Sequence, residues 1–458
     1  MKKIIQKTSL TILTIILFTT SCVVQKPIPQ EKVFYLPPKI DKKEVINFFA
    51  DLPFDSDKEI KVALMVPLSG KHEKLGKDLY RAAQLALFDH GDPRIVIYPY
   101  DTEASEFKSI ELINKIIEEE IKIVIGPVFA KNVKSIKPLA QQYDLKIFTF
   151  SNDTSIAGGG VYTLGIDVKQ QIARIVAYAI KNGYEYFSAL APANHFGADA
   201  VKQLRLSAHA KAMILKSEFY SDNSSLKRNI TKVLKSMQYS PVNEQGQQIF
   251  KDLTIAEMMQ ETVSKNNNLP DIAETNLTTD TESENITTEL EEEVFYRDIN
   301  EYKRALLLAD SANNLQIIAE LADFSKFTGE FKILGTSLMS TEDILTLDIF
   351  ANAWFTDLPK ANIFSFEKHF FDVFGYMPQN MSIFAYDMVS VISALAAYDE
   401  VYNISYLENY VGFSGISGVF RFNQDGIVER LFEIYEIRAG VRNTIDPAPF
   451  QFEEVTNN

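Results

Sequence analysis

Residues 60–87 read IKVALMVPLSGKHEKLGKDLYRAAQLAL, and this stretch decides the fold class of the chain. An apolar run from Val62 to Val66 stops at Pro67-Leu68-Ser69-Gly70, and a helical pattern begins near Gly76. The pattern predicts a buried strand, a tight turn with free backbone amides, and a helix whose N-terminus faces the turn. Because a helix N-terminus carries partial positive charge, we expect an anion-receiving site here that includes Ser69.

Apolar strands and amphipathic helices alternate along most of the chain. Such alternation predicts α/β architecture with mostly parallel sheets that helices cover on both faces. Strands are expected at 60–67, 94–99, 121–126, 145–151, 186–191, 212–219 and 303–309, and helices at 106–119, 130–142, 168–182 and 197–209. After about residue 413 the pattern changes to short strands, with a hairpin turn from Asn423 to Gly426.

Length and charge restrict the classes of function. A chain of 458 residues with 46% hydrophobic residues can form two or more lobes with full cores. The net charge of −15 argues against a nucleic-acid partner and against a polybasic membrane patch.

The N-terminus has the features of a secretory signal. Lys2 and Lys3 precede a mostly apolar run at 4–18, which is too short for a permanent membrane span. Cys22 follows small residues and is the only cysteine, so it can form no disulfide within the chain. It resembles the lipid-modified cysteine of bacterial lipoproteins, although Thr19 stands where that motif usually has Leu.

This resemblance implies a signal peptide at 1–22 and a lipid on Cys22 that anchors the protein at the periplasmic face of the envelope. The outer membrane is favoured over the inner one. Ordinary signal-peptidase cleavage with an incidental cysteine is the alternative. We interpret 23–57 as a Pro-rich tether, 266–293 as an acidic disordered insertion, and 451–458 as a tail.

Six motifs in order along residues 58–440 resemble the type I periplasmic binding proteins, the leucine/isoleucine/valine-binding class. They are Ile125-Gly126-Pro127, Phe150 to Thr154, Gly165-Ile166-Asp167, His195-Phe196-Gly197, Phe374 to Pro378 with Ala385-Tyr386-Asp387, and FSGISGVFRFNQDG at 413–426. The resemblance implies two lobes joined by a hinge of three crossovers. We expect lobe 1 at 58–165 and 353–422, and lobe 2 at 166–352 and 423–450.

A narrower resemblance concerns the second half of the chain. Ala353-Trp354-Phe355 before Leu358-Pro359, the pair Glu429-Arg430, and Ile445 to Pro449 are similar to the penicillin-binding-protein activator family. It implies a non-enzymatic, lipid-anchored regulator that contacts a peptidoglycan synthase, a class A penicillin-binding protein, with Trp354 and Phe355 at the hinge. The alternative is a solute receptor for amino acids or small amides in an ABC transport or sensing system.

In receptors of this fold a cleft between the lobes holds the ligand. The expected cleft residues are Ser69, Lys131, Ser151, Asp153, Thr154 and Asp167. Ser151 and Thr154 offer hydroxyls, and Asp167 lies where an ammonium partner is expected. Asp153 would repel an α-carboxylate unless Lys131 offsets its charge, because buried charges must be paired. A free amino acid is therefore disfavoured, while another small-molecule ligand stays possible.

Catalysis finds little support in the sequence. The five histidines fall singly and no second cysteine joins them, so no zinc motif is visible. Neither Ser69-Gly70 nor Ser414-Gly415 has the strand–nucleophile–helix pattern of a hydrolase. We expect no catalytic residues, no metal and no cofactor.

Overall fold

The computed structural model describes residues 59–242, 295–322, 330–408 and 411–452. The chain divides after Asp57, and all described residues belong to the unit Lys58–Asn458. The expected signal peptide with Cys22, the tether at 23–57 and the insertion at 266–293 lie outside the described residues.

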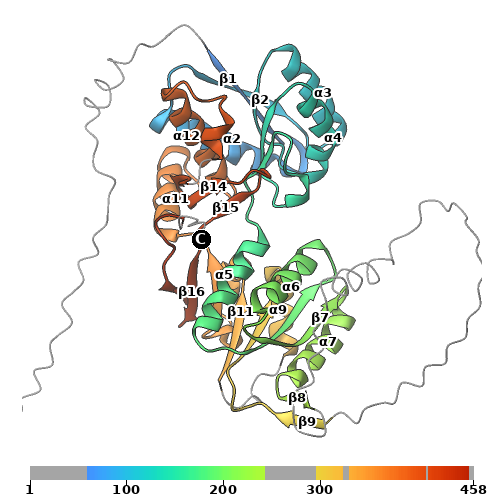
Figure 1. Ribbon diagram of the computed structural model, residues 1–458. Coiled ribbons are helices and arrows are strands. Elements are labelled where there is room, and N and C mark those ends of the chain that lie inside the picture. Colours follow the sequence, from blue (N-terminus) through green and yellow to red (C-terminus); the bar gives the residue numbers. More distant parts are fainter. Residues whose placement is uncertain (1–58, 243–294, 323–329, 409–410, 453–458) are drawn as a thin grey trace, which may run out of the picture. The chain divides into compact units, whose positions relative to one another are not determined.

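The first lobe is built on a parallel five-stranded sheet in the order β2-β1-β3-β4-β5 (Figure 1). Its strands are β1 (Ile60–Val66), β2 (Ile95–Asp101), β3 (Ile123–Ile125), β4 (Lys146–Thr149) and β5 (Val161–Thr163). Its helices are η1 (Gly70–His72), α2 (Glu73–His90), α3 (Glu106–Glu118), α4 (Ala130–Gln142), η2 (Thr154–Ile156), α11 (Lys360–Phe374), α12 (Ser382–Ala397) and α13 (Ile404–Leu407).

Alternate residues of β1 enter different cores, as expected for a strand covered on both faces. Val62 and Leu64 pack against α2, α11 and α12. Ala63 and Met65 pack against α3 and α4 on the other face (Figure 1). This explains why the strand reads as a continuous apolar run in the sequence.

The second lobe is built on a seven-stranded sheet in the order β17-β16-β12-β11-β10-β6-β7. Neighbouring strands are parallel from β12 through β7, whereas β16 and β17 are antiparallel additions. Its strands are β6 (Tyr186–Pro192), β7 (Met213–Tyr220), β10 (Arg304–Leu308), β11 (Phe331–Gly335), β12 (Trp354–Asp357), β16 (Glu433–Arg438) and β17 (Val441–Asp446).

Helices cover both faces of this second sheet as well. Side chains of α5 and α6 share a core with one face, and those of α7 and α9 share a core with the other. The helices are α5 (Val168–Lys181), α6 (His195–Ala208), α7 (Asn223–Ser236), α9 (Ala312–Leu321), η4 (Ser337–Ser340), α10 (Glu342–Leu345) and η5 (Asp348–Phe350). The predicted α/β class with mostly parallel sheets is confirmed.

The described residues also form two small sheets. One pairs β8 (Tyr239–Val242) with β9 (Phe295–Asp298). The other contains β13 (Phe413–Gly415), β14 (Gly418–Phe422) and β15 (Val428–Arg430) in antiparallel order. The β14–β15 pair contains the hairpin predicted around Asn423 to Gly426.

Two segments lie in a different lobe from the one expected. Trp354–Asp357 pairs with β11 and β16 in the second sheet, so the chain returns to the first core after Asp357 and not at residue 353. Val428 and Phe432 pack in the core of the first lobe, so β15 belongs there and not to lobe 2. A short buried strand has the same composition in either sheet, and only its long-range pairing decides its membership.

The helices of the described residues include none that is both long enough and apolar enough to span a membrane.

Candidate functional site

The carboxyl ends of parallel strands meet at one edge of a sheet, which is where α/β folds bind ligands. In the first lobe this edge includes the turn after β1, where Ser69 is exposed. Helix α2 closely approaches the same turn, because a Cβ atom on Gly76 would lie 1.8 Å from the carbonyl oxygen of Pro67. The glycine expected near the helix start therefore permits this contact.

A carboxylate of the chain itself binds the turn after β1. Oδ1 of Asp101, at the end of β2, accepts hydrogen bonds from the backbone N–H groups of Leu68 at 2.8 Å and Glu103 at 2.9 Å. Burial raises the pKa of Asp101, but hydrogen bonds from Ser69 and from backbone N–H groups bring it below its ordinary value. The Asp101 carboxylate thus takes the place of the ligand anion that the sequence led us to expect at this turn.

The loop after β4 is likewise closed by internal hydrogen bonds. Oγ of the buried Ser151 accepts from the backbone N–H of Asp153 at 3.1 Å. The Asp153 carboxylate accepts from the backbone N–H of Ser155 at 3.0 Å and thereby caps η2. Asp153 also accepts from Nζ of Lys134 at 3.1 Å. Burial raises the pKa of Asp153, but the bonds from Ser155 and Lys134 lower it below its usual value.

Lys134 supplies the positive charge for Asp153 that the sequence analysis considered for Lys131. Nζ of Lys131 lies 3.7 Å from the carboxylate of Glu106 and is exposed. The two lysines are three residues apart on the same side of α4, so the packing of that helix beside the loop decides which one meets Asp153.

Asp167 begins α5 and already has a cationic partner. It is 6% exposed and accepts from the backbone N–H of Lys169 at 2.9 Å. Nζ of Lys169 lies 3.8 Å from the Asp167 carboxylate and donates to Oγ1 of Thr154 at 2.8 Å. Burial raises the pKa of Asp167, while Lys169 opposes that rise. Lys169 therefore fills the role predicted for the ammonium group of a ligand.

Trp354 and Phe355 lie within the second sheet and not in a hinge segment. Trp354 donates from Nε1 to Glu436 at 3.0 Å, and Nζ of Lys332 lies 4.5 Å from the centroid of its ring. Phe355 is fully buried on the opposite face and stacks on Tyr435, with ring centroids 5.5 Å apart. Both residues expected at the hinge thus belong to β12, which ends at Asp357, just before the chain returns to the first lobe.

A buried polar cluster, which we call the Arg430 cluster, lies where the chain passes between lobes. Arg430 donates to Oγ of Ser417 and to the carbonyl oxygen of Leu164, the latter at 2.8 Å. Ser417 donates in turn to the carboxylate of Asp387. Burial lowers the pKa of Arg430 to about 10, against the opposing influence of Asp387, whose own pKa burial raises.

Further hydrogen bonds connect the helix after the first crossover to the strand before the last one. Nε2 of Gln170 donates to the carbonyl oxygen of Val428 at 2.7 Å, and its Oε1 accepts from the backbone N–H of Arg430 at 2.9 Å. Arg174 donates to the carbonyl oxygen of Phe432 at 3.2 Å. Together these bonds fix the first and third crossover segments to each other.

Another buried carboxylate lies after β10. Asp310 is 1% exposed and accepts hydrogen bonds from the Tyr220 hydroxyl, the backbone N–H of Ser311 and Nδ2 of Asn314. Burial raises its pKa above the ordinary value. Its hydrogen bonds connect the ends of β7 and β10 with the start of α9.

The predicted cleft residues thus form three groups. Ser151, Asp153 and Thr154 lie in one stretch after β4, and Thr154 meets Asp167 through Lys169. Ser69 interacts with Asp101, and Lys131 lies apart with Glu106. No group of three or more His, Cys, Asp or Glu side chains that could hold a metal occurs in the described ranges.

The sequence analysis missed the three residues that complete these groups: Asp101, Lys134 and Lys169. A signal existed for Asp101, since it ends an apolar strand next to β1 in a parallel sheet. A signal also existed for Lys169, because it stands two residues after a helix-capping Asp. Gln170 and Arg174 carry no comparable signal, since their partners lie about 260 residues away in sequence.

Comparison with known protein families gives one match that extends over half of the chain. The family model described as "LppC putative lipoprotein" matches residues 44–277. The penicillin-binding protein activator LpoA of Vibrio cholerae is 25% identical over 187 residues, which is 38% of this chain and 30% of that protein. An uncharacterized protein of Rickettsia prowazekii is 25% identical over 167 residues, 36% of this chain and 44% of that one. The matches therefore span less than half the length of these relatives.

Solved structures share the fold at low sequence identity. Haemophilus influenzae LpoA matches with a TM-score of 0.54 and 14% identity over 85% of this chain and 59% of that one. The leucine-binding protein LivK of Thermotoga maritima matches with a TM-score of 0.51 and 13% identity over 85% of this chain and 98% of that one. These similarities bear on the fold alone and agree with the type I periplasmic-binding-protein architecture.

Proposed function

This chain belongs to the LppC lipoprotein family, and from that membership we propose that it activates a penicillin-binding protein by direct contact. We propose further that a lipid on Cys22 holds it at the periplasmic face of the envelope, in the outer membrane. Its partner would be a class A penicillin-binding protein, a peptidoglycan synthase. The similarity to LpoA proteins supports this proposal. In this account the chain catalyses no reaction of its own.

The observation that most favours contact over ligand capture is the internal pairing of the two charges a zwitterionic ligand would need. In the turn after β1, where a ligand carboxylate would be received, the backbone N–H of Leu68 already donates to the Asp101 carboxylate. Lys169 pairs with Asp167, where a ligand ammonium would be received. An amino acid would have to displace both groups, and each displaced charge would lose the partner that it has within the chain.

A solute receptor is the second candidate, because the fold is shared with a leucine-binding protein. The Asp167→Asn variant separates the two functions. Asn is as good a helix cap as Asp, so α5 keeps its N-terminal hydrogen bond while the charge is lost. A receptor for cationic or zwitterionic ligands would lose binding, whereas a contact activator would keep its partner.

The test compares wild type and Asp167→Asn in two assays. Thermal-shift screening against amino acids, small amides and peptidoglycan fragments should show no stabilisation, whereas a true ligand at a hundredfold excess over Kd would stabilise by about 2.7 kcal/mol. Surface plasmon resonance against the class A penicillin-binding protein of the same cell should show equal binding for both proteins. Stoichiometric ligand binding that Asp167→Asn abolishes would overturn the proposal.

A further inference from the structure

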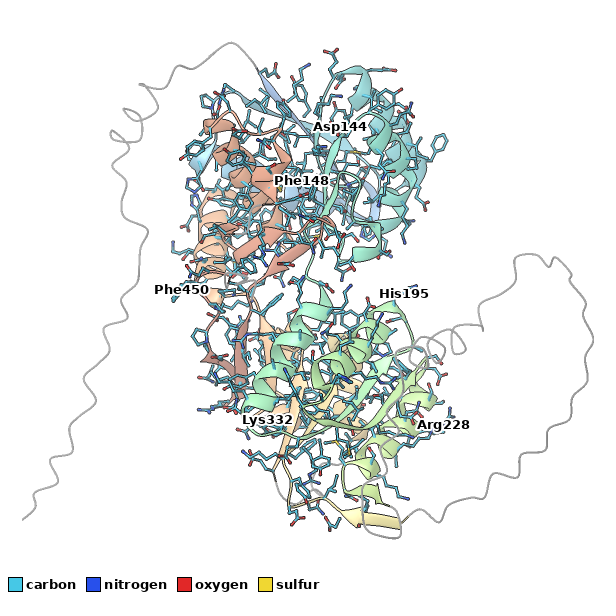
Figure 2. The ribbon with its side chains drawn as sticks, in the orientation of Figure 1. Asp144, Phe148, His195, Arg228, Lys332 and Phe450 are labelled. Atoms are coloured by element: carbon cyan, nitrogen blue, oxygen red, sulfur yellow. The ribbon has the colours of Figure 1, made fainter. Side chains whose placement is uncertain are left out.

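Helix α7 has a positively charged surface with no acidic residue among its 14 positions. Its apolar side packs in a core of the second lobe. Its solvent side holds four exposed basic residues, and Arg228 among them is labelled in Figure 2. We call them the α7 basic face: Lys227, Arg228, Lys232 and Lys235.

Few charges of this face are paired within the described residues. On α4 and α5 the basic residues include Lys134 and Lys169, which pair with carboxylates. On α7 the described residues give such a partner to Lys232 alone, Glu218 at 3.7 Å. Within the described part of the chain, the side chains of the other three members make no ion pair or hydrogen bond.

The segment that follows α7 is the most acidic part of the sequence. Residues 243–294 contain 13 Asp and Glu against 2 Lys, so they account for −11 of the net charge of −15. The segment is attached to β8 and β9, which pair with Val242 opposite Phe295. Because β8 begins three residues after α7 ends and pairs with β9, the two strands to which the acidic segment is attached lie near that helix.

We propose that residues 243–294, the acidic segment, dock on the α7 basic face. A helix of 14 residues is about 21 Å long, and a chain of 52 residues can reach its whole length. Attachment at β8 and β9 makes the contact intramolecular, with an effective concentration of the segment on the order of millimolar. Several exposed charge pairs, each weak by itself, are then enough to hold the segment on α7.

The charge of the acidic segment also disfavours an external anion as the usual occupant. An anionic membrane or polymer that approached α7 would compete with a segment of net charge −11 that is attached to β8 and β9. The segment would have to leave before such a partner could bind. This inference is independent of the proposed function, because it concerns only contacts within the chain.

Carbodiimide cross-linking of the full chain tests the proposal, because this reagent joins a lysine amine to a carboxylate in direct contact. We expect Lys227, Lys232 and Lys235 to cross-link to residues 243–294 several-fold more than Lys181 on α5 and Lys202 on α6. Both control lysines are exposed, and neither has a partner among the described residues. In 1 M NaCl the Debye length falls to about 3 Å, and the preference should disappear.

A charge-reversal pair provides the matched variants. Lys227→Glu with Arg228→Glu should lower cross-linking at Lys232 several-fold, because the reversed charges repel the acidic segment. The substitutions break no described side-chain contact, so the fold should stay intact. Lys181→Glu with Lys202→Glu changes the net charge equally and should leave cross-linking at Lys232 unchanged. Equal cross-linking of α7 and control lysines in the wild type would overturn the proposal, as would a preference that survives 1 M NaCl or the α7 reversal.

Discussion

Replacing Arg430 with Met should strongly destabilise the protein. The substitution removes the hydrogen bonds to Ser417 and to the carbonyl oxygen of Leu164, and it removes the cation near Asp387. Asp387 is 3% exposed, so its charge cannot be solvated by water instead. Breaking a buried charge cluster in this way costs about 3–5 kcal/mol, a large share of the 5–15 kcal/mol that is typical for domains.

Urea denaturation followed by circular dichroism measures this loss. With a denaturant slope of about 3 kcal/mol per M, the unfolding midpoint of Arg430→Met should fall by roughly 1 M or more. Arg421→Met is the matched control, because Arg421 lies on the neighbouring strand and its pair with Glu429 is partly exposed. Such a pair contributes at most about 1 kcal/mol.

A double-mutant cycle with Asp387→Asn tests the assigned coupling between the two charges. If Arg430 and Asp387 stabilise each other, the double variant should lose less than the sum of the two single losses. The reasoning would be refuted if Arg430→Met lowered the midpoint no more than Arg421→Met does. Additive losses in the cycle would refute the coupling specifically.

Four further predictions concern other parts of the chain. Asp101→Ala should cost about 1–3 kcal/mol in urea unfolding because backbone N–H groups lose their acceptor, and Asp101→Asn should cost less. The raised pKa of Asp310 means that the native state binds a proton more readily than the unfolded state. The wild type should therefore gain stability relative to Asp310→Asn as pH falls from that raised value toward 3.8, and a pH-independent difference would contradict this. Deleting 266–293 should change the melting temperature little, since few apolar side chains are lost. A loss of several kcal/mol in the free energy of unfolding would show that the segment contains an ordered element. Cys22→Ala should leave the fold intact and release the protein from membranes, whereas retention after high-salt washing would refute the lipid anchor.

The strands with long apolar runs bounded by turn residues could be predicted closely from sequence, whereas the strands β5, β11 and β12 were not among those expected. The first strand was expected at 60–67 and forms at Ile60–Val66, and the helix expected at 130–142 forms at Ala130–Gln142. These elements depend on local patterns of burial that repeat along a single segment.

The lobe boundaries and the ion pairs could not be predicted in the same way. Trp354–Asp357 joins the second sheet through pairing with strands distant in sequence, and its composition contains no information about that choice. Lys131 and Lys134 lie three residues apart on α4, on the same side of the helix, and which of them meets Asp153 depends on how α4 packs beside the loop after β4. Long-range pairing and the packing of helices therefore set the limits of the sequence analysis.

The rate of glycan polymerisation by the class A penicillin-binding protein of the same cell tests the central claim most directly. The synthase is assayed alone, with the wild-type chain, and with the Asp167→Asn variant, without added small molecules. The account predicts that the wild-type chain raises the rate until the two proteins are equimolar, and that Asp167→Asn raises it equally. An unchanged rate with the wild-type chain, or a stimulation that Asp167→Asn abolishes, would contradict it.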